Sequence, residues 1–183
     1  MDSDTVIFFL ALLAVLAQVL VAVALVLMLG GLVSPALARV RDQVRAELGP
    51  QALGLAATVA IICTVGSIYL SEGVGYPPCR LCWYQRYAMY PLAPFLLLAA
   101  LRRWPTARLP AGVVAVVGGS ISIYHILVER YPSLESGSCD PFNPCSIKWV
   151  EHFGYLTIPT MALSGFALIV VLLIAATPAK ETS

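Results

Sequence analysis

Charged side chains are scarce in this chain. They make up 11% of its 183 residues, while 60% are hydrophobic, and the mean hydropathy is +0.87. An ordinary soluble domain is about a quarter charged and about half apolar. So short a chain cannot hide this much apolar surface from water. The composition therefore excludes an ordinary soluble domain and predicts that lipid covers much of the surface.

The chain also lacks long internal repeats, low-complexity segments and extended basic tracts. Its basic residues gather in two short connections flanked by apolar segments, which is not the pattern of a nucleic-acid-binding surface. Because positive residues tend to stay on the cytoplasmic side of a membrane, both connections are predicted to be cytoplasmic. The residues are Arg39, Arg41 and Arg45 in the first, and Arg102, Arg103 and Arg108 in the second.

Five segments are long and apolar enough to cross a bilayer, which takes about 20 helical residues. In lipid a segment must satisfy its own backbone hydrogen bonds, so each is predicted to be a helix. The sequence thus predicts an all-α polytopic membrane protein. The third segment is the least apolar, since Gln85 and Arg86 lie near its start. The predicted spans are 5–33, 53–70, 83–101, 109–128 and 155–176.

The first span resembles a secretory signal only superficially. Asp2 and Asp4 replace the usual basic residues, and the apolar run is too long, so we expect a retained helix with its N-terminus outside. Alternation then places 71–82 and 129–154 outside, and the tail with Lys180 inside. Both basic connections fall on one side of the membrane and all four paired cysteines on the other.

Cys79 and Cys82 form a Cys-x-x-Cys pair at the predicted start of the third helix. A helix N-terminus carries partial positive charge, and Arg80 adds a full one, so a thiolate is stabilised there. The thiolate is the species that attacks a disulfide. A zinc site is the alternative, but the second pair, Cys139 and Cys145, is spaced too widely for the usual ligand motif. Redox exchange is favoured.

Cys139 and Cys145 lie in the longest outer connection, which is rich in Gly, Pro and Ser. We expect this loop to be mobile and exposed, as suits a pair that meets another protein. A purely structural disulfide is the alternative for this pair. Cys63 lies within the second span and is interpreted as a small buried apolar residue.

Arg86 shares a helix face with Cys79 and Cys82, because the three occupy positions i, i+3 and i+7. A charge inside a membrane helix is a functional candidate, although an arginine so near the interface can also reach the headgroups. His125 is predicted at a similar depth on the fourth span. It is a candidate for hydrogen bonding a membrane-embedded acceptor, the alternative being an ordinary interfacial histidine.

These motifs resemble those of the DsbB family of disulfide bond formation proteins. The stretch Pro-Cys-Arg-Leu-Cys-Trp-Tyr-Gln-Arg at 78–86 is similar to the first cysteine motif of the family. Pro-Cys-Ser-Ile-Lys-Trp at 144–149, followed by Phe153-Gly154 and Thr157-Ile158-Pro159, is similar to its BdbC branch. The resemblance covers about 53–176. It implies a DsbB-like four-helix redox domain at 51–183, while 1–50 adds one further transmembrane helix and a basic linker.

The resemblance also implies a function. The family reoxidises an extracytoplasmic thioredoxin-fold thiol oxidase, of the DsbA or BdbD kind, and passes the electrons to ubiquinone or menaquinone in the bacterial cytoplasmic membrane. By position, Cys139 or Cys145 forms the mixed disulfide, with Cys139 preferred, and Cys79 reoxidises that pair. Cys82 and Arg86 then face the quinone, and His125 is carried over by its place before Tyr131-Pro132. No metal is implied.

Two rival functions stay open at this stage. One is a reductive relay that carries electrons outward, which needs cysteines reachable from the cytoplasm. The other is a channel, receptor or assembly protein whose disulfides are structural.

Overall fold

The computed structural model describes residues 3–135, 139–140 and 142–176. Asp2 and Lys180, which entered the predictions for the two ends of the chain, lie outside these residues. The described residues are mostly helical and contain no strand apart from two isolated bridges, Asp140–Asn143 and His152–Leu156. The predicted all-α fold is confirmed.

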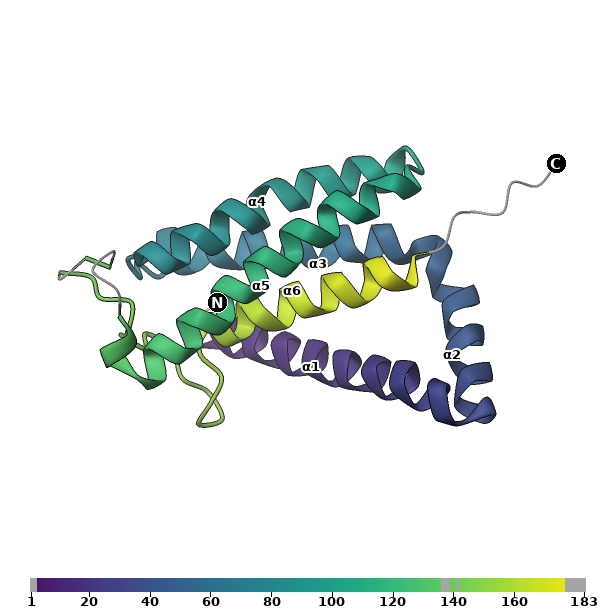
Figure 1. Ribbon diagram of the computed structural model, residues 1–183. Coiled ribbons are helices and arrows are strands. Elements are labelled where there is room, and N and C mark those ends of the chain that lie inside the picture. The colour runs from purple at the N-terminus through teal and green to yellow at the C-terminus, as the bar shows by residue number, and fades with distance from the viewer. Residues whose placement is uncertain (1–2, 136–138, 141, 177–183) are drawn as a thin grey trace.

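Four helices form a closed ring in which each packs against its two neighbours (Figure 1). Their shared core holds large apolar side chains such as Leu92, Leu96 and Phe166, all 2% exposed or less. Gly118 allows close helix packing, because a Cβ there would collide with the Phe166 ring. The four are α3 (Ala52–Ile68), α4 (Arg80–Leu101), α5 (Arg108–Arg130) and α6 (Ile158–Ala175).

Two further helices precede the ring. Helix α1 (Ser3–Val33) packs against α6 on the outside of the ring, and α2 (Pro35–Leu48) lies across one end (Figure 1). The sequence predicts only a basic linker where α2 lies. A helix forms there because Pro35 starts it and apolar residues recur at helical spacing, as Leu37, Val40 and Val44 do.

Membrane-spanning length and composition are found in four helical segments of the described chain: Ser3–Val33, Pro35–Gly73, Pro105–Arg130 and Ile158–Ala175. Helix α4 does not meet the same hydropathy, since its first two turns carry Arg80, Gln85 and Arg86. Its 22 residues nevertheless measure about 33 Å, enough to cross a bilayer, and it packs between α3 and α5. We therefore treat α4 as the fifth span.

The last span begins at Ile158 rather than at residue 155. His152 and Leu156 pair across a tight turn in which Phe153 and Gly154 have positive φ, 54° and 73°. Residues 155 and 156 therefore belong to this turn and not to the helix, where the hydropathy pattern had placed them.

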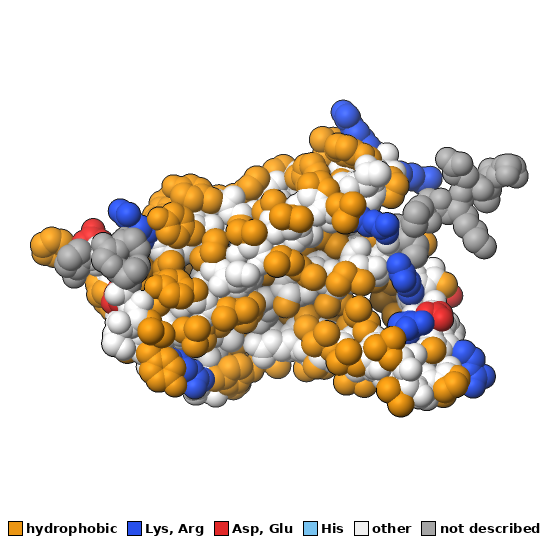
Figure 2. All heavy atoms as spheres, in the orientation of Figure 1, with side chains coloured by type: hydrophobic (Ala, Val, Ile, Leu, Met, Phe, Trp, Pro, Cys, Tyr) orange, Lys and Arg blue, Asp and Glu red, His pale blue; other side chains and the backbone are white. Residues whose placement is uncertain are grey.

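The two ends of the bundle differ in the residues they carry. Both basic connections lie at one end, called here the basic end, and both cysteine pairs lie at the other, the cysteine end. Figure 2 shows charged side chains gathered toward the two ends, with a mainly apolar band between them. The basic connections and the paired cysteines therefore lie at opposite ends of the bundle, as the predicted topology requires, while the side of the membrane that each end faces stays a prediction.

Candidate active site

Cys79 is the N-cap residue of α4, and the pair thus lies at the start of this helix, as the sequence predicted. Its Sγ accepts a hydrogen bond from the backbone N–H of Cys82 at 3.3 Å, and the two Sγ atoms are 2.8 Å apart. Both are free thiols in this structure. The hydrogen bond from the Cys82 side chain, supported by His125, lowers the pKa of Cys79 to about 5 although burial opposes it. Cys79 is therefore poised to be the thiolate of the pair.

The loop pair is a disulfide between Cys139 and Cys145, with Cα atoms 6.0 Å apart. Cys145 is only 1% exposed and packs in one cluster with Cys79 and Val128, with Cys139 at its edge. The Glu135 carboxylate holds Cys145 in this position, because it accepts hydrogen bonds from the Cys145 backbone N–H and from the Ser146 hydroxyl. The expectation of an exposed pair is wrong for Cys145, because the loop folds back onto the helix ends.

His125 connects the two pairs. It is 2% exposed, and its Nε2 lies 3.0 Å from the Cys145 carbonyl oxygen and 3.6 Å from Cys79 Sγ. Its Nδ1 lies 3.1 Å from Gln85 Nε2. A carbonyl oxygen can only accept, so the proton must sit on His125 Nε2, and the Gln85 amide then donates to Nδ1. The Nε2–H group points at Cys79 and at the backbone of Cys145.

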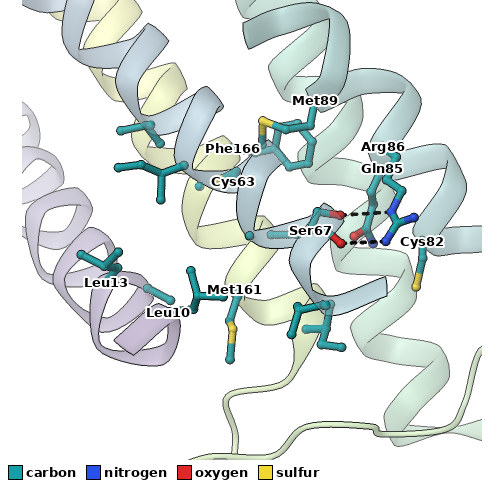
Figure 3. A pocket seen from close by; sticks show the side chains of 18 of the residues that line it. Leu10, Leu13, Cys63, Ser67, Cys82, Gln85, Arg86, Met89, Met161 and Phe166 are labelled. Atoms are coloured by element: carbon teal, nitrogen blue, oxygen red, sulfur yellow. Dashed lines mark hydrogen bonds between the residues drawn. The ribbon is translucent and has the colours of Figure 1, made fainter. Parts of the chain in front are cut away.

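A cavity of about 290 Å³ lies on the other side of the Cys79/Cys82 pair, between α1, α3, α4 and α6 (Figure 3). Cys82 and Arg86 line it from α4, on the helix face that the sequence predicted they share. Cys79 was predicted on that same face but does not line the cavity. Most of the remaining lining is apolar. Cys63, expected to be simply buried, also lines this cavity from α3.

Arg86 is held in place within the cavity wall. Its Nε donates to Ser67 Oγ at 3.0 Å and its Nη2 to the Ser67 carbonyl at 2.9 Å, as Figure 3 shows. The guanidinium also lies 5.2 Å from the centroid of the Trp83 ring. Ser67 lies two residues before a π-helical turn, η2 (Tyr69–Gly73), a feature common at functional sites. The charge is thereby oriented toward the cavity beside Cys82.

The histidine occupies a different place from the one expected. His125 is not among the residues that line the cavity; it contacts Cys79 and Cys145 instead. Gln85 was missed, although a glutamine three residues after Cys82 inside a membrane helix was a detectable signal. It lines the cavity and also bonds His125, so it joins the two sides.

A zinc site fits this geometry poorly. Cys79, Cys82 and His125 bring three ligand atoms within 4.8 Å of one another. Two thiolates on one tetrahedral zinc would lie about 3.8 Å apart, given zinc–sulfur bonds of about 2.3 Å, whereas these sulfurs are 2.8 Å apart. The other two cysteines are bonded to each other. Thiol–disulfide exchange suits the arrangement better.

Comparison with known proteins agrees with this chemistry. The sequence model of the family described as "Disulfide bond formation protein DsbB" matches residues 49–176. The chain belongs to the DsbB family. Both cysteine pairs lie inside the matched region, and α1 and α2 lie before it. No solved structure matches the chain.

Three relatives of this DsbB-family chain carry names that describe disulfide formation. A probable disulfide formation protein of Oceanobacillus iheyensis is 37% identical over 115 residues, 62% of this chain and 79% of the relative. Disulfide bond formation protein C of Bacillus subtilis is 39% identical over 114 residues, 62% and 83%. Probable disulfide formation protein C 2 of Bacillus anthracis is 35% identical over 121 residues, 66% and 86%. This membrane protein is thus an oxidoreductase acting on thiols.

Proposed function

We propose that this DsbB-family protein is a thiol:quinone oxidoreductase. It reoxidises a thioredoxin-fold thiol oxidase of the DsbA or BdbD kind and passes the electrons to ubiquinone or menaquinone. The observation that supports this most strongly is the position of the Cys79/Cys82 pair. One side of it contacts His125 and the loop pair, and the other side opens on an apolar cavity that contains Arg86.

The exchanges balance as three two-electron steps. The dithiol of the reduced partner attacks the Cys139–Cys145 disulfide. The partner is released with its own cysteines joined in a disulfide, and Cys139 and Cys145 become thiols. That dithiol then reduces the Cys79–Cys82 disulfide. Finally the Cys79/Cys82 dithiol becomes a disulfide again, and two electrons and two protons reduce the quinone to hydroquinone. The burial of Cys145 against Cys79 supports the middle step, because it needs the two pairs in contact.

Each side chain has a proposed task. The Nε2–H of His125 stabilises the Cys79 thiolate and holds the Cys145 backbone beside it. In the cavity, Cys82 faces the acceptor, and the Arg86 guanidinium donates to a ring carbonyl with the N–H groups that Ser67 does not use. A bound quinone supplies an acceptor for two electrons. The apolar lining fits such a lipid-soluble ring.

The proposed orientation follows from the two ends of the bundle. The basic end lies in the cytoplasm, and the cysteine end, with the start of α1, lies outside the cytoplasmic membrane. There the compartment permits disulfides and a secreted thiol oxidase is within reach.

The test mixes purified protein, a quinone and a reduced DsbA-like or BdbD-like protein. We expect the quinone absorbance to fall as the partner becomes oxidised, and a Cys145→Ser variant to accumulate a mixed disulfide through Cys139. A protein with only structural disulfides predicts neither result. An outward reductive relay predicts reduction of the loop pair by a reductant on the basic side. The proposal would be wrong if neither expected result appeared, or if a reductant on the basic side reduced the loop pair.

A further inference from the structure

Helix α1 forms one wall of the cavity that Cys82 and Arg86 line. Figure 3 shows Leu10 and Leu13 on the side opposite Arg86, Gln85 and Cys82. The α1 lining residues recur at helical spacing and so lie on one face of that helix. They are Leu10, Leu13, Ala14, Leu16, Ala17 and Leu20.

This wall is docked in a defined register. Gln18 donates to Ser164 Oγ on α6 at 3.0 Å and accepts from the Tyr155 hydroxyl at 2.8 Å. A glutamine inside a membrane helix is unfavourable unless its amide is paired, and here both ends of the amide are paired. Two turns earlier on α1, the fully buried Ala11 packs with Leu156, which precedes α6. Helix α1 is therefore fixed to α6 rather than free to drift in lipid.

The same helix closes the cavity near its polar part. Leu10 approaches α3 at Gly66, where an added Cβ would lie only 3.1 Å from a Leu10 methyl. Gly66 directly precedes Ser67, the residue that holds Arg86. From there the lining continues along α1 to Leu20, ten residues or about 15 Å toward the basic end.

The cavity is thus polar at one wall and apolar along another. The polar groups on α4 come from Cys82, Gln85, Arg86 and Tyr90, whereas the α1 wall contributes only leucine and alanine. A ligand that matches both walls has a compact polar ring and a long apolar tail.

We propose that α1 is the tail-binding wall of the acceptor site. The α1 residues that line the cavity, from Leu10 to Leu20, contact the isoprenoid tail of the quinone whose ring lies at Cys82 and Arg86. This inference rests on the proposed function and extends it to a helix that precedes the family-matched region, residues 49–176. It makes α1 part of the binding site and not only a membrane anchor.

The first experiment uses the wild-type protein, so it does not depend on how a variant folds. A quinone with a photoactivatable group on its tail is cross-linked in membranes, and the labelled residues are mapped. We expect label within residues 10–20, removed by an excess of unlabelled long-tailed quinone. Label found only on other helices, or label that excess quinone does not remove, would overturn the inference.

The second experiment compares Leu13→Trp with the matched control Leu12→Trp, since Leu12 is exposed and does not line the cavity. Filling the wall at residue 13 should raise the KM for a long-tailed quinone about tenfold, corresponding to about 1.4 kcal/mol of lost binding. The KM for a quinone with a single isoprene unit should change less than about twofold, and Leu12→Trp should change neither. Equal KM values for Leu13→Trp and Leu12→Trp would refute the tail wall.

The two proposals fail differently. If the wild type reduces both quinones but α1 takes no label, only the tail-binding wall is lost. If the wild type reduces no quinone with any reduced partner, the proposed function itself is wrong.

Discussion

Cys79 and Cys82 begin the same helix with their sulfurs 2.8 Å apart, yet their surroundings differ. Cys79 is 4% exposed and meets the imidazole of His125 and the buried end of the loop disulfide. Cys82 borders the apolar cavity beside Arg86. The helix start separates a side suited to thiol exchange from a side suited to a lipid-soluble acceptor.

This difference has a physical basis in helix geometry. Residues three apart lie on nearly the same helix face, but the first of them here is the N-cap, whose side chain turns back over the exposed N–H groups. Cys79 therefore points toward the end of α5, while Cys82 follows the α4 face that borders the cavity. Two adjacent thiols can then take different roles without any large movement.

Cys82→Ser tests the comparison most severely. The cavity side would lose the sulfur proposed to pass electrons on, so quinone reduction by a reduced partner should be abolished, as measured by quinone absorbance. The same variant should still exchange thiols with the partner through Cys139 and Cys145, which shows that it is folded. Unchanged turnover would mean that the two sides are not divided as proposed.

Arg86→Gln tests the cavity side without touching a thiol. A hydrogen bond from a charged donor contributes about 1.5–3 kcal/mol, so kcat/KM for quinone should fall about 10- to 100-fold, mainly through KM. Arg86→Lys should restore little, because an ammonium group cannot reproduce the paired contacts with Ser67. Arg102→Gln, at an exposed arginine of the basic end, is the control and should change KM less than about twofold.

His125→Ala tests the exchange side and has the smallest expected effect. A pKa of about 5 keeps Cys79 largely a thiolate above that pH. Losing the His125 contribution raises this pKa, so alkylation of Cys79 should slow by about 2- to 10-fold at pH 4, below the pKa, as expected for one hydrogen bond. At pH 9 the difference should disappear. His152→Ala is the control. An unchanged pH profile in His125→Ala would mean that His125 does not stabilise the Cys79 thiolate.

Much of the fold was predictable because helix length and helix boundaries depend on nearby residues, through hydropathy and through boundary residues such as proline. Apolar length predicts the helices, and the Pro-Pro-Cys sequence marks the start of α4. Helix α2 was missed because its 14 residues are too few and too charged to suggest a membrane span. Its helical pattern was nevertheless present, since the apolar Leu37, Val40 and Val44 recur at helical spacing. The start of α6 was shifted by the His152–Leu156 turn, a contact that hydropathy does not describe.

The candidate site was predictable as a set of residues, but less so as an arrangement. The shared face of Cys82 and Arg86 follows from spacing along one helix. The burial of Cys145 does not follow from its sequence neighbours, because it depends on Glu135 and on packing against α4 and α5. His125 was expected at the right depth, but the rotation of α5 directs its ring toward Cys79.

The sequence by itself determined that the chain is a helical membrane protein with two cysteine pairs at one end, one of them beginning a helix. Those features depend on composition and on periodicities within single segments, which any sequence displays directly. Only the tertiary structure decided that Cys79 meets His125, that Cys145 is buried against Cys79, and that α1 walls the cavity at Cys82. These contacts join residues far apart in the chain, and they depend on how each helix is rotated and docked against its neighbours.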